Sequence, residues 1–380
     1  MRVLISADWH LGRQGIGGVD LTPYQKELLL SWFLDELVLK LRPEVLIVAG
    51  DIFDSKRPSA EALSLFSEFV DAIADLRLPA VFLAGNHDLP ELVTYMEGIL
   101  SRHGLHMISA ANWSEKNVIV DLPGLIFLPH LSVYRREGRS MEEILEDLAS
   151  RYDPANSILI THLTILGSVQ EAWDEWEIGF VPIIPANMLR AWKLVVSGHL
   201  HGHHMPASNV VYPGSLLKYH PQEKNQKKTV LLVDTETGQW EALSVPQKID
   251  MLEVAGYWDK DHCQFVIEDL YRAPFSDTDF LVLVTLSRPG GDLSLAKGVI
   301  SALEAEYPGV KFFFGKVHSI AHQLANESSA APTQTLVKLS PQRLVHRFLQ
   351  EHNLLESVPI ERINDIIGEI FATMEKSHEA

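Results

Sequence analysis

The sequence predicts an α/β protein in which short buried strands alternate with helices in layers. Five apolar runs of strand length, rich in Val, Ile and Leu, each end in polar residues, and helix-like segments separate the first three. Because the runs are apolar without alternation, both faces of each strand should be covered. The runs are residues 2–10, 44–51, 80–88, 157–163 and 193–201.

Two helices are expected between the first three runs. The first should begin with Thr22 as its N-cap and Pro23 at the first helical position, and extend to about residue 41. The second covers residues 59–76, where apolar residues recur at helical spacing. These apolar positions are Leu63, Phe66, Val70 and Ile73.

The character of the chain changes near Ile249, after a further expected strand at 227–234 and a turn. The pieces that follow predict strand 280–287, helix 294–308 and strand 310–317. We therefore divide the chain into a main domain at 1–245, a small α+β domain at 250–320, a linker at 321–339 and a helical segment at 340–380.

The helical segment carries a narrow apolar seam of the coiled-coil type. The seam consists of Ile360, Ile363, Ile367, Ile370 and Met374. It could pack on the body of this protein or dock the helices of a partner, and we favour the partner.

Composition limits the function. The 380 residues carry a net charge of −18, whereas free-standing nucleic-acid binders usually carry a basic surface. Any contact with nucleic acid should therefore be local, carried by metal ions or shared with a partner. The single cysteine excludes an internal disulfide and an all-cysteine zinc site. The apolar runs are too short for a signal peptide or a membrane span, so a cytoplasmic location is the simplest expectation.

Polar side chains that can bind metals lie at the carboxyl end of each of the five runs. In chain order they are Asp8, His10, Asp51, Asn86, His162, His199 and His201. Members two residues apart, such as Asp8 and His10, point to the same side of an extended segment. Seven nitrogen and oxygen ligands fit two ions that share a carboxylate. The mixture suits Mn²⁺, with Mg²⁺, Fe²⁺ or Zn²⁺ as alternatives.

Glycines precede three of these candidates, at Gly50, Gly85 and Gly198, where they allow sharp turns and close approach to a ligand. A single buried Asp or His usually has a structural explanation. Five strand ends that supply such residues in chain order favour a metal centre instead.

Five motifs together resemble the signature blocks of the calcineurin-like metallophosphoesterases. They are Asp-Trp-His at 8–10, Gly-Asp-Ile-Phe-Asp at 50–54, Gly-Asn-His-Asp at 85–88, Thr-His-Leu at 161–163 and Gly-His-Leu-His at 198–201. The resemblance implies a layered sheet-sandwich core and two bound ions that share Asp51. The first ion would also be held by Asp8, His10 and His201, and the second by Asn86, His162 and His199.

The resemblance also implies a catalytic role for two residues outside the ligand set. His87 resembles the family's non-ligand histidine, which stabilises the transition state or protonates the leaving oxygen. Asp54 resembles the carboxylate that orients this histidine in related phosphatases, although a histidine stands there in some nucleases, and an ordinary turn aspartate is the alternative. Asp88 is expected to support the ligand residues without itself binding a metal.

Three stretches, at 6–13, 212–219 and 225–234, resemble the SbcD nucleases more narrowly. This implies a DNA exonuclease and endonuclease, acting on duplex ends and hairpins in DNA repair and recombination. It also implies an SbcC-type ATPase partner bound through the C-terminal helices, a DNA-capping role for the small domain, and a homodimer contact near 90–104.

Contacts with DNA are expected first at Arg13, which closely follows Asp8 and His10. Other basic residues are candidates for which a solvated surface position is the ordinary alternative: Lys56, Arg57, Arg135, Arg136, Arg139, Lys218, Lys224, Lys227 and Lys228. His203 and His204 lie beyond the ligand pair and are expected at the surface or at the edge of the substrate site.

Two other functions compete with the nuclease. A calcineurin-like phosphatase or small-nucleotide phosphodiesterase would share the metal centre. Phosphoprotein phosphatases continue the second motif as Asp-Arg-Gly, whereas this chain has Asp54-Ser55-Lys56, and small phosphodiesterases generally lack a region like 249–380. A non-catalytic scaffold would have lost one or more ligands, whereas every ligand position here is filled.

Overall fold

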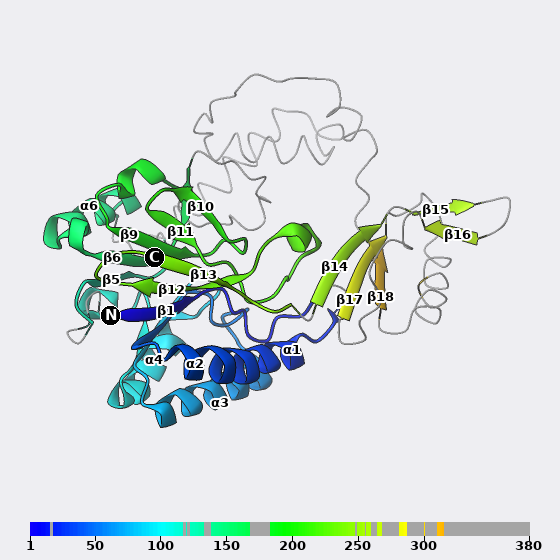
Figure 1. The fold of residues 1–380 in the computed structure, drawn as a ribbon, viewed down its shortest axis with the longest axis horizontal. Helices are drawn as coiled ribbons and strands as arrows, with labels where there is room; N and C mark the ends of the chain where they lie inside the picture. The colour runs from blue at the N-terminus through cyan, green and yellow to red at the C-terminus, as the bar shows by residue number, and fades with distance from the viewer. Residues whose placement is uncertain are drawn as a thin grey trace, which may run out of the picture. The chain divides into compact units, whose positions relative to one another are not determined.

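The fold is described from a computed structural model (Figure 1). The structure describes residues 1–15, 18–116, 119, 122–132, 138–167, 183–247, 249–254, 256–259, 264–267, 281–286, 300 and 310–314. The chain divides into two units after Val317, and the second unit, 318–380, lies outside the described residues. The predicted linker and helical segment lie in that second unit.

Two sheets carry the main domain. The first has the strand order β13-β12-β1-β2-β3-β4, in which β1 to β4 are parallel and β12 and β13 antiparallel to their neighbours. Its strands are β1 (Arg2–Ser6), β2 (Val45–Ala49), β3 (Ala80–Leu83), β4 (Leu105–Ile108), β12 (Thr229–Asp234) and β13 (Trp240–Ser244).

The second sheet has the order β10-β11-β9-β6-β5 and is parallel except for β10. Its strands are β5 (Leu125–Leu128), β6 (Ile158–His162), β9 (Leu194–Gly198), β10 (His204–Ala207) and β11 (Val210–Tyr212). The five predicted strands are thus present as β1, β2, β3, β6 and β9, and the layered α/β prediction is confirmed.

Alternate side chains of β1 belong to two different apolar cores. Val3 and Ile5 pack between the sheets with Phe127 and Val196 of the second sheet. Leu4 packs on the other side, in the core formed with the helices. Because both faces are covered, the strand has an uninterrupted apolar sequence.

Helices α1 to α3 lie together beside the first sheet (Figure 1). They are α1 (Thr22–Lys26), the π-helical η2 (Glu27–Val38), α2 (Leu39–Leu41) and α3 (Ala60–Leu76). The prediction that Thr22 is an N-cap is wrong. Thr22 is the first helical residue after the N-cap Leu21, and its N–H donates to Asp20 Oδ1 at 2.9 Å, which places Pro23 second.

The predicted helix at 59–76 is confirmed as α3. Ser59 Oγ caps it by accepting from the N–H of Ala62 at 3.2 Å, and Phe66, Val70 and Ile73 are buried. The remaining elements of the main domain are α4 (Pro90–Leu100), η3 (Ser101–His103), α5 (Trp113–Lys116), α6 (Met141–Arg151), η5 (Pro154–Asn156), β7 (Thr164–Leu166), β8 (Ile183–Pro185), η6 (Ala186–Leu189) and η7 (Pro221–Asn225).

A separate three-stranded parallel sheet follows in the order β14-β17-β18. It consists of β14 (Ile249–Val254), β17 (Leu281–Leu286) and β18 (Val310–Phe314), while β15 (Gly256–Asp259) and β16 (Gln264–Ile267) form an antiparallel pair. The strands expected at 280–287 and 310–317 are present. The helix expected between them lies outside the described residues except for position 300, which is helical.

Among the described residues, no helix combines the length and apolarity needed to cross a bilayer.

Candidate metal centre

All seven predicted ligand side chains lie at or just beyond the carboxyl ends of parallel strands. β1 leads to Asp8 and His10, β2 to Asp51, β3 to Asn86, β6 ends at His162, and β9 leads to His199 and His201. Six of the seven are at most 5% exposed, and Asn86 is half-buried. Sites in α/β sheets form at this edge because the strands deliver their following loops to one place.

Backbone strain is concentrated at these residues. Asp8, His10, Asp51 and His199 have positive φ values of 52°, 44°, 50° and 95°. Such conformations cost about 1–3 kcal/mol each in non-glycine residues and persist only where the surrounding structure holds them. Here the N–H of Asp8 donates to the Gly50 carbonyl and that of His10 to the Asp51 carbonyl, both at 3.0 Å.

Two glycines allow the loops to approach the ligand side chains, as their positions in the sequence predicted. A Cβ at Gly85 would lie 2.1 Å from Asp51 Oδ1. Gly50 has a φ of +96°, and a Cβ there would lie 2.0 Å from His162 Nδ1. Any larger residue at either position would displace a candidate ligand.

The first group of side chains surrounds His10. Asp8, His10 and Asp51 offer ligand atoms that all lie within 4.8 Å of one another. His10 Nε2 lies 3.0 Å from His201 Nε2 and 3.6 Å from Asp51 Oδ2. Two imidazole nitrogens that face each other at this distance need a proton or a cation between them, and a divalent cation also suits the carboxylates.

The second group consists of Asp51, His162 and His199, again with ligand atoms within 4.8 Å. His162 Nε2 lies 3.4 Å from Asp51 Oδ2, and Asn86 Oδ1 lies 3.1 Å from both His162 Nε2 and His199 Nδ1. Asp51 belongs to both groups, as a bridging ligand would.

Three buried atoms of the centre have no hydrogen-bond partner among the described residues: Asp8 Oδ2, His10 Nδ1 and His199 Nε2. Leaving such groups unsatisfied is costly. His162 donates from Nδ1 to the Ala49 carbonyl at 3.0 Å, so in the neutral ring Nε2 carries the lone pair and is turned toward Asp51. The donor set therefore fits divalent cations.

Burial governs protonation in the centre. It raises the pKa of Asp8 to about 7 and lowers the pKa of His10 to about 3. Burial also opposes the charged form of His162, but the Asp51 carboxylate overcomes it and raises that pKa to about 9. A cation at the centre would stabilise the charged carboxylates and accept the lone pairs of neutral imidazoles.

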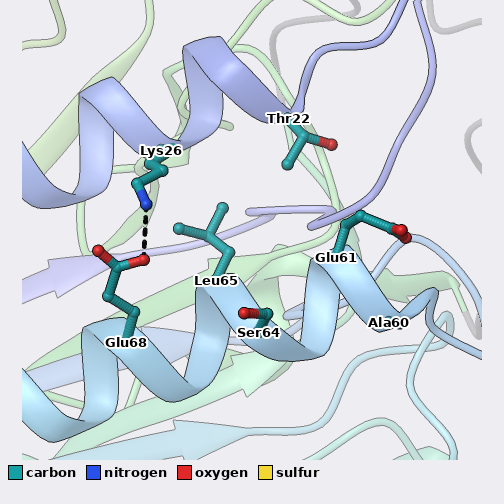
Figure 2. Close-up of a pocket in the computed structure, with 7 residues that line it drawn as sticks. All are labelled: Thr22, Lys26, Ala60, Glu61, Ser64, Leu65 and Glu68. Carbon is teal, nitrogen blue, oxygen red and sulfur yellow. Dashed lines mark hydrogen bonds and ion pairs between the residues drawn. The ribbon is translucent and has the colours of Figure 1, made fainter.

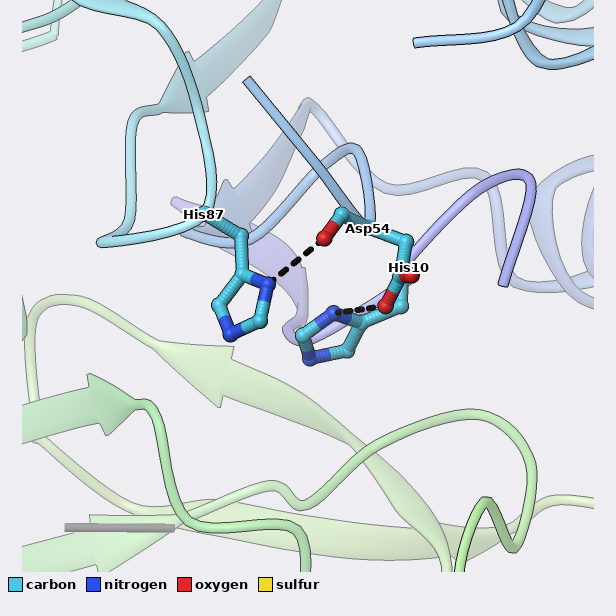
Figure 3. Close-up of side chains that lie close together, drawn as sticks. All are labelled: His10, Asp54 and His87. Atoms are coloured by element: carbon cyan, nitrogen blue, oxygen red, sulfur yellow. Dashed lines mark hydrogen bonds and ion pairs between the residues drawn. The ribbon is translucent and has the colours of Figure 1, made fainter. Parts of the chain in front are cut away.

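His87 and Asp54 lie beside the first group (Figure 3). His87 uses its main-chain N–H to bind Asp51 Oδ1 at 2.9 Å and its Nδ1–H to bind the main-chain carbonyl of Asp54 at 2.6 Å. The Asp54 carboxylate instead lies 3.4 Å from His10 Nδ1 and 3.3 Å from Arg13. Asp54 thus orients His87 through its carbonyl, whereas the family resemblance pointed to its carboxylate.

Asp88 holds two ligand-bearing loops together. Its carboxylate accepts hydrogen bonds from the N–H groups of Ile52 at 3.1 Å, Phe53 at 2.9 Å and Gly85 at 2.8 Å. Burial raises the pKa of Asp88 to about 6 despite these bonds. This supporting position agrees with the expectation for Asp88.

Several supporting residues were not predicted. Gln25 Nε2 donates to the carbonyls of His10 at 2.8 Å and Trp9 at 3.1 Å, and the Tyr219 hydroxyl donates to the same Trp9 carbonyl at 2.5 Å. Glu223 accepts from His201 Nδ1 at 2.9 Å. The available signal in the sequence was a glutamine, Gln25, at helical spacing from Leu21, Leu28 and Leu29.

The basic candidates have different surroundings. Arg13 lies near the centre, 5.1 Å above the Tyr219 ring. Lys228 is buried and ion-paired with Glu223, so it is not a surface contact for DNA. Arg139 pairs with Asp147 at 3.1 Å. Lys56, Arg57 and Lys227 are exposed, and Lys218 and Lys224 are half-buried. Arg135 and Arg136 lie outside the described residues.

His203 and His204 do not join the centre. His203 Nδ1 donates to the Tyr212 carbonyl at 2.8 Å, and His204 stacks on the Tyr212 ring with centroids 4.6 Å apart. Both are half-buried packing residues of the β10–β11 region.

Comparison with known proteins supports this interpretation. A family model described as calcineurin-like phosphoesterase matches residues 1–203. The SbcD subunit of the SbcCD nuclease from Staphylococcus epidermidis is 29% identical over 257 residues, which cover 63% of this chain and 67% of that protein. The protein of the same name from Staphylococcus saprophyticus is 26% identical over 270 residues, covering 67% and 71%.

Among solved structures, the crystal structure of TT1561 of Thermus thermophilus matches with a TM-score of 0.39 and 13% identity. The match covers 64% of this chain and 99% of that one. This likeness is too distant to inform function. The family model, in contrast, covers more than half of the chain and all of the strand-end motifs. This chain belongs to the calcineurin-like phosphoesterase family and is a metal-dependent phosphodiesterase.

Proposed function

We propose that this protein is a two-metal DNA nuclease that cleaves duplex ends and hairpins and acts with an SbcC-type ATPase in DNA repair. The observation that carries the proposal is the convergence of seven ligand side chains, among which the buried Asp8 Oδ2 and His199 Nε2 have no hydrogen-bond partner among the described residues. The names of the two staphylococcal relatives support the nuclease class.

In this proposal two ions, most simply Mn²⁺, would share Asp51 as a ligand. Asp8, His10 and His201 would complete the first set, and Asn86, His162 and His199 would complete the second. Support comes from the membership of Asp51 in both groups. Bound cations would neutralise the phosphodiester oxygens and activate water for in-line attack.

The protein's own residues supply the proton and the orientation. Since the Nδ1–H of His87 is committed to the Asp54 carbonyl, Nε2 is the atom that can carry a proton to the leaving oxygen. Arg13 is held by Asp54 at 3.3 Å and is partly exposed, which suits a contact with a backbone phosphate.

The partners are part of the same proposal. The net charge of −18 makes it reasonable that DNA affinity is shared with an ATPase, bound through residues 340–380. The small domain at 250–320 would cap the DNA. Helix α4 exposes Tyr95 (70%) and Ile99 (52%), an apolar pair that suits a homodimer contact.

The test compares substrates and partners in one series. With Mn²⁺, we expect the chain to cleave linear duplex DNA, and hydrolysis of p-nitrophenyl phosphate and cyclic nucleotides to be much slower. Co-expression with an SbcC-type ATPase should yield a stable complex that is lost when Ser340–Ala380 is deleted. Efficient hydrolysis of small esters without DNA cleavage would contradict the nuclease and favour a small-nucleotide phosphodiesterase.

A further inference from the structure

A buried ion pair contacts His201, one of the candidate ligands of the first ion. Glu223, in η7, and Lys228, just before β12, are 1% and 3% exposed, and Lys228 Nζ lies 2.5 Å from Glu223 Oε2. Burying two charges is expensive, and a buried pair is weak evidence for stability alone. Its position beside a candidate ligand therefore needs a different explanation.

The Glu223 carboxylate fixes the ring of His201. Its Oε1 accepts from His201 Nδ1 at 2.9 Å, while Oε2 also accepts from the N–H of Tyr219 at 3.2 Å. The same carboxylate forms an ion pair with Lys228. Because an ionised carboxylate only accepts, the proton of His201 is on Nδ1 and Nε2 faces His10 Nε2 at 3.0 Å.

Lys228 fixes the backbone of the same histidine. Its Nζ donates to the His201 carbonyl at 2.9 Å, to Ser215 Oγ at 2.9 Å and to Gln226 Oε1 at 3.0 Å. The ion pair thus binds both the ring and the main chain of His201, which lies in the loop after β9. Metal-binding histidines are commonly oriented in this way by a carboxylate on their second ring nitrogen.

We propose that Glu223 and Lys228 are positioning residues that hold His201 with Nε2 directed at the first cation. The inference rests on the proposed two-metal function. It deepens that function by assigning the polar segment between β11 and β12 a role in loading one ion of the pair. Glu223 fixes the tautomer and orientation of the His201 ring, and Lys228 binds both the Glu223 carboxylate and the His201 carbonyl.

The test uses a double variant, Glu223→Gln with Lys228→Met, which removes both charges and so leaves no unpaired buried ion. Titration with Mn²⁺ is monitored by calorimetry and electron paramagnetic resonance. The double variant should bind one of the two ions about 10- to 100-fold more weakly than the unaltered protein does. Circular dichroism checks that the variant is folded. Adding the double variant to His201→Ala should cause no loss of Mn²⁺ affinity beyond that of His201→Ala alone, because Glu223 and Lys228 act through the His201 side chain.

The matched control removes an ion pair of the same residue types for which the described residues show no contact with a candidate ligand. Lys26 Nζ lies 2.7 Å from Glu68 Oε2 across a pocket of about 340 Å³ between α1 and α3 (Figure 2). Both side chains are about half exposed, so Lys26→Met with Glu68→Gln should leave both Mn²⁺ affinities unchanged.

The outcomes separate the two levels of the proposal. A folded double variant that binds both ions as tightly as the unaltered protein would overturn the inference. An unaltered protein that binds no divalent cation would instead overturn the proposed function. If the double variant does not fold, Glu223→Asp, which keeps the charge beside Lys228 but shortens the side chain, should still weaken one ion, and unchanged binding by it would overturn the inference.

Discussion

Replacing His87 by alanine should lower the rate of DNA cleavage by roughly 100- to 10,000-fold, the range typical for loss of a general acid, while Mn²⁺ binding remains intact. The expected separation follows from the contacts of residue 87. Its main-chain N–H, which donates to Asp51 Oδ1 at 2.9 Å, is kept in the variant, whereas the ring fixed by the Asp54 carbonyl is lost. Single-turnover cleavage and Mn²⁺ titration measure the two effects.

A control for the removal of an imidazole is His103→Ala, since His103 is exposed in η3. It should cleave DNA at the unaltered rate. A His87→Ala protein that binds Mn²⁺ normally and loses less than about tenfold in cleavage would show that His87 is not the acid.

Replacing Asp51 by asparagine should abolish cleavage and weaken the binding of both ions by more than about 100-fold. A shared ligand contributes to both ions, and the loss of a residue that only supports a ligand already lowers metal affinity by about 10- to 100-fold. The substitution preserves shape and can still accept the N–H of His87, so the loop itself should survive. Calorimetric titration with Mn²⁺, with circular dichroism as the check on folding, measures the effect.

Two single-site variants sharpen this result. Asp8→Asn should weaken only the first ion, and His199→Ala only the second, because each belongs to one group. If Asp51→Asn retained one ion at full affinity, Asp51 would not be the bridge.

The strands, and the polar side chains that meet at their ends, were predictable from the sequence for the same physical reason. A strand covered on both faces is an uninterrupted apolar run, and a charged, imidazole or amide side chain marks the point where the run ends. In parallel strands those ends meet, so Asp8, Asp51 and His162 could be grouped although they are far apart in the chain.

The supporting residues were less predictable because their roles depend on tertiary contacts. Lys228 is one of several lysines in a polar segment, and nothing in the sequence separates it from exposed neighbours such as Lys227. The contact between His87 and the Asp54 carbonyl involves the main chain, which no side-chain pattern encodes. The left-handed conformations of Asp8 and His10 likewise arise from the loops that hold them.

Electron paramagnetic resonance of the unaltered protein titrated with Mn²⁺ tests the two-metal centre most directly. Two ions held by the same Asp51 carboxylate would be close enough for their spins to couple. We therefore predict two Mn²⁺ bound per chain, with the spectrum of isolated Mn²⁺ at substoichiometric loading replaced by that of a coupled pair at saturation. Saturation at one ion per chain, or two ions without coupling, would contradict the account.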